Sequence, residues 1–447
     1  MSEQLWAKNL PLDVQIHAFT VGNDPVTDLQ LLPFDAEGSA AHARMLGECG
    51  LLPKSEAQAL VAELRKLRDE ALHGRLSISL QQEDGHTALE NALTDRLGAT
   101  GRRIHLARSR NDQVQTALRL LMRARVLEIG QALADCASSF DRFAQLHGAV
   151  VLPGYTHLRR AMPSSWGMWS TAFAEGLLEE LQQLPALWLR IDRSPLGAAA
   201  GFGAPVAIDR ARSADLLGFA QVQRNPVDVM NGRGRHEQAI AAWIVSAAGT
   251  LEKALWDLLL WSTEEFGFVR LPDAFTTGSS LMPQKRNPDV LELARARCRE
   301  LRGLAGLLAH VAGGLPSSYH RDHQLLKAPF LEITTKGEQL FTIVTQLVGA
   351  LEVDAEACSR ACSPDIYAAR EACRLAAEGV PFRDAYIRVA KELEDGSFRA
   401  SAMNAETEMG VDLAVDALAA EVAASSAWVT ERQQFLAAAT ERLFDWP

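Results

Sequence analysis

Apolar residues recur along this chain at spacings of three and four, within long stretches that contain no proline. No proline lies between Pro53 and Pro153, and inside that stretch five apolar positions are separated by four, three, four and three residues. They are Ile129, Leu133, Cys136, Phe140 and Phe143. This spacing places all five side chains on one face of a helix. It predicts a long helix here, capped at Asn111 or Asp112.

Two further segments have the same helical character. Residues 227–271, bounded by prolines, are rich in Ala, Leu and Trp and lack the alternation typical of strands. A third helix is predicted from Pro288 to a stop at Gly313-Gly314. Its apolar seam is Leu301, Leu304, Leu308 and Val311. Several helices of this length predict an all-α fold built on a long central bundle, and the width of the seams predicts that bundles associate.

The chain shows no internal repeat, low-complexity tract or Gly/Ser linker that would mark a sharp domain boundary. We expect three regions: an N-terminal helical domain at 1–108, the central bundle at 109–355, and a small helical domain at 356–447. The last region is expected to carry short helices and no chemistry.

Composition restricts the possible partners. With 447 residues and 48% hydrophobic content, the chain can bury a large core, which argues against disorder. A net charge of −11 argues against a nucleic-acid or anionic-membrane partner. The six cysteines lack C-x-x-C spacing, and no signal-peptide pattern or membrane-length apolar run is present. We therefore expect a cytoplasmic protein with reduced cysteines.

The richest candidate chemistry lies in residues 278–289, Gly-Ser-Ser-Leu-Met-Pro-Gln-Lys-Arg-Asn-Pro-Asp. Asn287 is expected to cap a helix whose first residue is the following proline. The free backbone N–H groups of a helix start, beside Lys285, favour an anion. A hydroxyl of Ser279 or Ser280 loses its proton more easily in that positive field. The segment predicts an anion-binding catalytic loop; the alternative is a plain capped surface loop.

Four segments, in this order, resemble signatures of the fumarase/aspartase superfamily and, within it, of the argininosuccinate lyase family. They are His105–Gln113, Leu152–His157, Gly278–Asp289 and Tyr319–Lys327. The resemblance covers nearly the whole chain. It implies a homotetramer whose central helices merge into one core, with each active site collecting segments from three subunits. It also implies reversible cleavage of argininosuccinate to L-arginine and fumarate in arginine biosynthesis, without a cofactor or metal.

The chemistry of this elimination determines which groups the site needs. Proton removal beside a carboxylate requires donors that hold it as an aci-carboxylate, with the negative charge spread onto its oxygens, and Lys285, Asn287 and loop amides suit this. The resemblance makes Ser279 the base. It makes His157 a second proton-handling group, which donates to the leaving group directly, acts through water, or polarises the base. Thr156 is expected to bind a substrate carboxylate.

The resemblance also implies two binding segments. Ser109, Arg110 and Asn111 are expected to bind the succinyl carboxylates, although the same residues also suit a charged helix start. Three residues are expected on the amino-acid side of the substrate: Tyr319, Gln324 and Lys327. His86 is either a site residue or a structural histidine. His320-x-x-His323 lacks a third ligand, so no metal is expected.

The chain departs from the family pattern in two places. Phe19-Thr-Val-Gly22 stands where many members carry a substrate-contacting Ser, so backbone amides near Gly22 are the expected substitute. Residues 324–328, Gln-Leu-Leu-Lys-Ala, lack acidic groups that are common there. A modified argininosuccinate is therefore left open as substrate. Two other hypotheses are another fumarate-releasing lyase, of the adenylosuccinate lyase or aspartase type, and a crystallin-like structural protein without activity.

Overall fold

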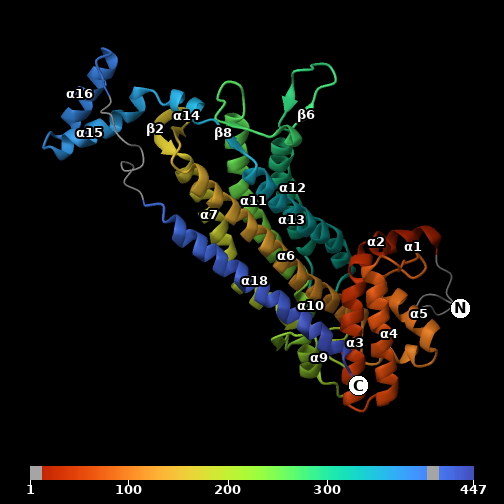
Figure 1. The fold of residues 1–447 in the computed structure, drawn as a ribbon. Coiled ribbons are helices and arrows are strands. Elements are labelled where there is room, and N and C mark those ends of the chain that lie inside the picture. The colour runs from red at the N-terminus through yellow and green to blue at the C-terminus, as the bar shows by residue number, and fades with distance from the viewer. Residues whose placement is uncertain (1–12, 400–411, 447) are drawn as a thin grey trace.

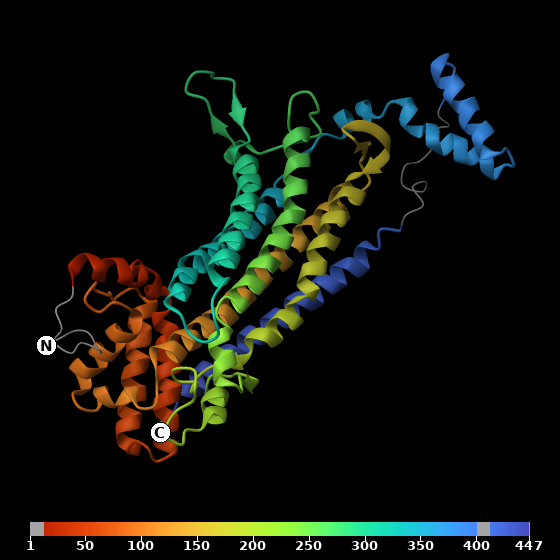
Figure 2. The same ribbon diagram turned by 180° about the vertical axis from the view of Figure 1, so that it is seen from behind.

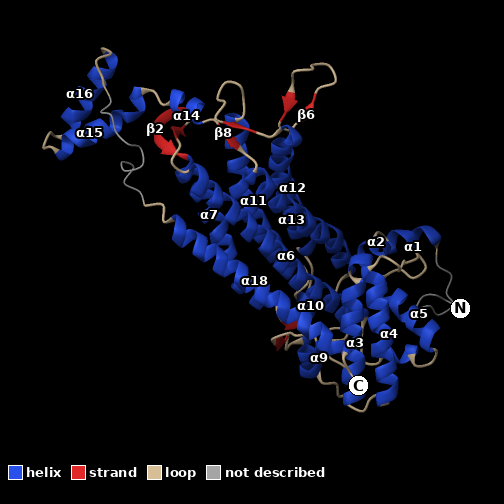
Figure 3. Ribbon diagram, viewed as in Figure 1, coloured by secondary structure: helices blue, strands red, loops and turns tan. Residues whose placement is uncertain are grey.

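The computed structural model describes residues 13–399 and 412–446, and long helices dominate it (Figure 1; Figure 3). Six helices form an elongated central bundle. They are α6 (Arg110–His147), α7 (Trp166–Gln182), α11 (Arg235–Trp261), α12 (Asp289–Ala312), α13 (Lys327–Gly349) and α18 (Val415–Phe444). The helix α6 packs against α7, α13 and α18, and α11 packs against α12. The predicted all-α fold with a long central bundle is confirmed.

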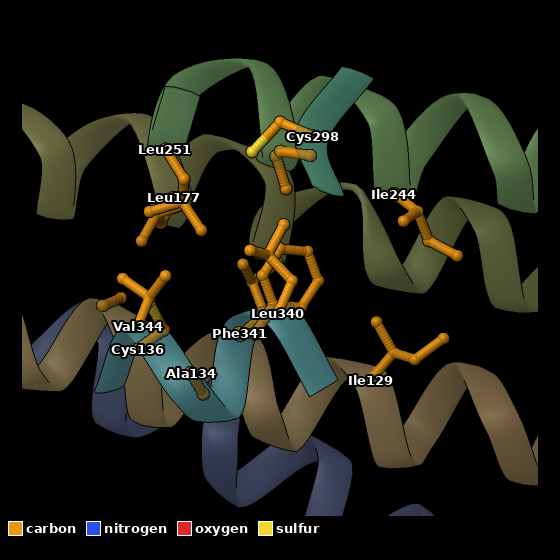
Figure 4. Packing of buried hydrophobic residues seen from close by; sticks show 14 of the residues in the cluster. Ile129, Ala134, Cys136, Leu177, Ile244, Leu251, Cys298, Leu340, Phe341 and Val344 are labelled. Atoms are coloured by element: carbon orange, nitrogen blue, oxygen red, sulfur yellow. The ribbon is translucent and has the colours of Figure 1, made fainter. Parts of the chain in front are cut away.

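The core follows the predicted seams. Ile129, Leu133, Cys136 and Phe140 are fully buried, and Leu301 and Leu308 of α12 are buried as well. Figure 4 shows side chains from α6, α7, α11, α12 and α13 meeting in one apolar layer. Each fully buried side chain of this size contributes about 1.5–3 kcal/mol.

The start of α6 differs from the prediction by two or three residues. Ser109, not Asn111 or Asp112, is the N-cap: its backbone is extended and its Oγ accepts a hydrogen bond from the Asn111 N–H at 3.3 Å. Asp112 instead completes a capping box, with its Oδ1 accepting from the Ser109 N–H at 3.0 Å. The small hydroxyl reaches the helix end because its backbone already lies outside the helix.

An N-terminal group of helices lies at one end of the bundle (Figure 2). It contains α1 (Val14–Val21), α2 (Asp24–Thr27), α3 (Leu32–Glu48), α4 (Lys54–Leu72) and α5 (Gly85–Leu97), with the 3₁₀ turns η1 (Asp28–Gln30) and η2 (Gly101–His105). The pair α3 and α4 encloses a second apolar core. Three short helices, α8 (Leu184–Ile191), α9 (Arg210–Leu216) and α10 (Pro226–Asn231), connect the long ones.

Short strands pair in twos. The antiparallel pairs are β1 (Val151–Thr156) with β2 (Arg159–Ser165), β5 (Val269–Arg270) with β8 (Glu352–Val353), and β6 (Thr277–Gly278) with β7 (Arg286–Asn287); β3 (Arg193–Ser194) pairs in parallel with β4 (Gln221–Val222). The β1–β2 and β6–β7 hairpins both lie at the end of the bundle away from the N-terminal helices (Figure 1). Two further 3₁₀ turns are η3 (Asp273–Phe275) and η4 (Arg321–Leu326).

The sequence predicts only short helices in the C-terminal part, and this prediction is wrong because the region also contains a long helix. The short helices α14 (Ala355–Ala361), α15 (Ala368–Ala377) and α16 (Phe382–Glu394), with η5 (Pro364–Tyr367), lie at the same end of the bundle as β2, and α15 and α16 project beyond it (Figure 1). In contrast, α18 has 30 residues and runs back along α6 to the N-terminal helices. Few large apolar residues lie on the buried face of α18, so its helical periodicity is weak in the sequence. The buried positions are Leu418, Val422, Val429, Ala439 and Leu443. The division at residues 108 and 355 remains a prediction.

Candidate active site

Residues from two of the predicted segments line one cavity, where the N-terminal helices meet the start of α6. We call it the helix-start cavity; its volume is about 180 Å³. The predicted site residues in its wall are Arg110, Asn111, Tyr319, Gln324 and Lys327, and His86 lies there too. The charged residues of the wall that are not among the predicted ones are Asp24, Asp28, Asp84, Arg233 and Arg321.

At the start of α6, Arg110 is held by the neighbouring helix α5. Its guanidinium lies 3.1 Å from Glu83 Oε2 and 3.3 Å from Asp84 Oδ2, and it donates to Thr87 Oγ1 at 2.7 Å. The Arg110 charge is thus largely balanced within the chain. Asn111, next to it, lines the cavity with a side-chain amide that can donate to a carboxylate.

Lys327 already holds two carboxylates. Its Nζ lies 2.6 Å from Asp28 Oδ1 and 2.8 Å from Asp24 Oδ1, while the Gly85 N–H donates to Asp28 Oδ2 at 3.1 Å. The side chains of Lys327 and Asp28 are 5% and 3% exposed, and that of Asp24 is 16% exposed. Burial raises the pKa of Asp24 to about 6, against the opposing effect of Lys327. The Asp24-x-x-x-Asp28 spacing was the signal in the sequence that could have found this pair.

Gln324 joins this wall to the end of α1. Its Nε2 donates to the carbonyl oxygens of Thr20 at 3.1 Å and Val21 at 2.8 Å. Arg321 donates to the same Thr20 carbonyl at 2.8 Å and to Gln324 Oε1 at 3.1 Å. Both acceptors of Arg321 are neutral, so its positive charge remains available at the cavity.

Gly22 terminates α1 rather than facing a ligand through its amide. Its backbone φ is +58°, a conformation that favours glycine, and its N–H donates to the Ala18 carbonyl at 2.9 Å. A Cβ at this position would lie 3.5 Å from Gln324 Nε2. The Gly22 N–H is therefore used by the helix end, and the substitution of the family Ser by other backbone amides near Gly22 remains a prediction.

His86 lies in the first turn of α5, whose N-cap is Asp84. Its Nδ1 lies 2.7 Å from Asp35 Oδ2, and both side chains are buried. Burial lowers the pKa of His86, but the carboxylates of Asp35, Asp84 and Asp28 raise it by more, so it lies above the ordinary value. This geometry suits a structural ion pair that also borders the cavity, so both interpretations of His86 stay open.

Thr156 and His157 lie at the tip of the β1–β2 hairpin. Thr156 pairs with Arg159, which leaves His157 and Leu158 as a two-residue turn. Both turn residues have positive φ, +54° and +58°, as a type I′ turn requires. Residues other than glycine rarely adopt a positive φ, and backbone strain of this kind is often found at functional sites. His157 is exposed.

The loop between β6 and β7 carries Ser279. The Ser279 Oγ accepts hydrogen bonds from the backbone N–H groups of Leu281 at 3.3 Å and Met282 at 3.1 Å. Two donors on the oxygen stabilise the negative charge that develops when the hydroxyl loses its proton. Within the described chain Ser280 receives no such pair of bonds, so the geometry favours Ser279. Lys285 lies exposed in the same loop.

The helix after this loop starts one residue later than predicted. Pro288 is the N-cap position and α12 begins at Asp289, while Asn287 belongs to β7 and pairs with Thr277. The Asn287 capping prediction is therefore wrong, because the hairpin holds its backbone in strand conformation. Asp289 and Glu292 occupy the first turn and offset part of the positive helix end.

The predicted residues thus lie in the helix-start cavity and in two hairpins at the far end of the bundle, and one chain does not bring the cavity together with either hairpin. The helix-start cavity and the β1–β2 turn lie at opposite ends of α6, whose 38 residues span about 57 Å. Ser279 and Tyr319 flank opposite ends of α12, whose 24 residues span about 36 Å. No side chain bridges such distances.

Within residues 13–399 and 412–446, no cluster of three or more His, Cys, Asp or Glu side chains is arranged to hold a metal ion. The six cysteines are free thiols. In the same described part, no helix is both long and apolar enough to cross a membrane.

Comparison with known proteins gives concordant results. A lyase family model matches residues 11–303. The chain is 40% identical over 398 residues to the argininosuccinate lyase of Bacteroides thetaiotaomicron, covering 89% of each chain. It is 42% identical over 426 residues to that of Sorangium cellulosum, covering 94% of this chain and 98% of the relative. Among solved structures, an EDDS lyase in complex with formate aligns with a TM-score of 0.79 at 23% identity, covering 98% and 95%.

Proposed function

The chain belongs to the argininosuccinate lyase family of the fumarase/aspartase superfamily, and we propose that it cleaves argininosuccinate reversibly to L-arginine and fumarate. The reaction is a carbon–nitrogen bond elimination in arginine biosynthesis. The structural observation that supports the proposed mechanism is that the Ser279 hydroxyl oxygen accepts two backbone hydrogen bonds.

In this proposal Ser279 removes the proton from the carbon beside a succinyl carboxylate. The Leu281 and Met282 amides lower the cost of forming the alkoxide, and the Lys285 ammonium adds positive charge to the loop. The carboxylate next to the reacting carbon takes up the negative charge, held by Lys285 and Asn287. Closure of the exposed loop over the substrate excludes water and strengthens these interactions.

The departing nitrogen of the guanidinium group needs a proton, and His157 is the proposed source, directly or through water. Thr156, Ser109, Arg110 and Asn111 are the proposed contacts of the succinyl carboxylates. Tyr319, Gln324 and Lys327 are proposed for the amino-acid end. Because Gln324 and Lys327 are already bonded within the chain, they act there mainly by fixing the shape and charge of the cavity.

We propose a homotetramer in which three subunits complete each site. The separation of the three residue groups along α6 and α12 supports this arrangement, because a single chain leaves every group incomplete. Exposed apolar side chains on α12 and α13 support it too, since Leu293 is 70% exposed and Ile343 41% exposed. The free thiols support a cytoplasmic location.

The test is ultraviolet absorbance of released fumarate from the purified protein with argininosuccinate, adenylosuccinate, aspartate and malate in parallel. Fumarate from argininosuccinate alone, with L-arginine as co-product, is the expected result. Fumarate from one of the others would overturn the substrate assignment but keep the serine-loop chemistry. Release from none would favour a structural role.

A further inference from the structure

One carboxylate in the helix-start cavity exceeds what the fold needs. Lys327 carries one positive charge, and buried Asp28, at 2.6 Å, already neutralises it. Asp24 adds a second carboxylate at 2.8 Å, so the group of three side chains carries a net charge of −1. Burying a carboxylate without a cation of its own is costly. The other cations of the cavity bond elsewhere: Arg110 to Glu83, Arg233 to Glu237 and Arg321 to the Thr20 carbonyl. Asp24 is therefore a carboxylate that a cationic ligand group would balance.

Asp24 differs from Asp28 in ways that suit ligand contact. Asp28 is 3% exposed and its other oxygen, Oδ2, accepts the Gly85 N–H, so both of its oxygens are used within the chain. Asp24 is 16% exposed and lines the cavity. Its raised pKa, caused first by burial, is the mark of a carboxylate that lacks sufficient positive partners.

The charges around the cavity suit a ligand group that carries both an ammonium and a carboxylate. Arg321 borders the same cavity and bonds only neutral acceptors at Thr20 and Gln324, so it can pair with a carboxylate. A free amino acid carries both an ammonium and a carboxylate on one carbon. The acidic side at Asp24 and the basic side at Arg321 match these two groups.

We propose that Asp24 binds the α-ammonium group of the substrate's amino-acid end and thereby selects argininosuccinate with a free amine over Nα-acylated forms. This rests on the proposed function and on the placement of the amino-acid end near Tyr319 and Gln324. An acyl group would remove the positive charge and place a neutral amide against a half-compensated carboxylate, which costs binding.

The test compares wild-type protein with Asp24→Asn and Asp24→Ser, using argininosuccinate and its chemically prepared Nα-acetyl derivative. Asp215→Asn is the matched control, since it makes the same charge change at an exposed carboxylate on α9. Both Asp24 variants should raise KM for argininosuccinate about tenfold or more, the effect of losing one charge-assisted hydrogen bond, with a smaller change in kcat. For the acetyl derivative kcat/KM should stay the same or rise, and Asp215→Asn should match the wild type.

Thermal unfolding separates recognition from a structural role. If Asp24 serves only to hold Lys327, its replacement lowers Tm and reduces kcat/KM on both compounds equally, which would overturn the proposal. A surplus carboxylate predicts the opposite: Tm does not fall, because Asp28 still pairs with Lys327. A wild-type preference for the acetyl derivative, or an unchanged KM in both variants, would also overturn the role of Asp24 while leaving the lyase reaction intact. A wild-type protein that releases no fumarate from either compound would overturn the proposed function and this inference with it.

Discussion

Ser109 and His157 lie beyond opposite ends of the same helix, α6, and are therefore separated by about 57 Å of rigid backbone. The core seam buried along that helix leaves no hinge that could bring them together. If both act in one reaction, they must come from different subunits.

Mixing Asn111→Ala subunits with His157→Ala subunits should restore part of the fumarate release that each variant lacks alone. Asn111 lines the helix-start cavity and His157 lies at the far hairpin, so some mixed sites contain both intact residues. Activity after denaturation and joint refolding measures the effect.

The matched control is a mixture of Asn111→Ala with Tyr319→Phe. Both residues line the cavity of one chain, so every cavity in the mixture stays defective and no recovery is expected. Recovery in the control, or none in the first mixture despite confirmed mixed oligomers, would contradict the shared-site arrangement.

Ser279→Ala should reduce kcat by about 10²–10⁴-fold, because the proton transfer loses its base. Ser280→Ala, one residue away, should retain most of the activity, since the two backbone bonds are made to the Ser279 oxygen. Steady-state fumarate release measures both. Similar losses in the two variants would count against the assignment of the base.

The two site lysines should separate activity from stability. Lys285 is exposed, so Lys285→Met should leave chemical unfolding unchanged while lowering kcat by about 10²-fold or more. Lys327→Met should cost about 3–5 kcal/mol in the free energy of unfolding, because Asp28 stays buried without its cation. Urea titration followed by fluorescence measures the difference. A Lys327→Met protein as stable as the wild type would disprove the buried pair.

Stability should fall as the pH is lowered from 6.5, in part through two buried histidines. Burial lowers the pKa of His42 to about 3 and that of His236 to about 2. Between pH 6.5 and about 3 the unfolded chain therefore binds more protons than the folded one. The free energy of unfolding then decreases by about 1.4 kcal/mol per pH unit for each histidine.

Tm measured from pH 7 to pH 5 checks this, with His42→Gln as the variant. Gln keeps a donor for the Leu106 carbonyl, which His42 Nε2 contacts at 2.8 Å, but cannot be protonated. Its Tm should fall less steeply with pH than that of the wild type. His73→Gln, at an exposed position after α4, should keep the wild-type slope. Equal slopes in all three proteins would exclude a contribution from His42.

The sequence by itself determined the fold class and the chemical inventory of the site. The spacing from Ile129 to Phe143 defines a buried helical face, because helical periodicity is a local property that neighbouring residues fix. The loop with Ser279 and Lys285 was recognisable for the same reason: its residues are adjacent in sequence. At helix starts the local patterns failed by small steps, as at Ser109 and Pro288, where side-chain capping and strand pairing set the boundary. They failed entirely for the long helix α18, whose buried face is sparse.

Tertiary structure alone decided which residues meet. It placed Asp24 and Asp28 against Lys327, some 300 positions further along the chain, and turned a predicted carboxylate-binding lysine into a buried ion pair. It joined Gln324 to the end of α1 and returned α18 along α6. It also kept Ser109 far from His157 along α6, and Tyr319 far from Ser279 along α12. Such long-range contacts depend on how helices pack, and the apolar seam of one helix shows that it packs but not which distant segment it packs against.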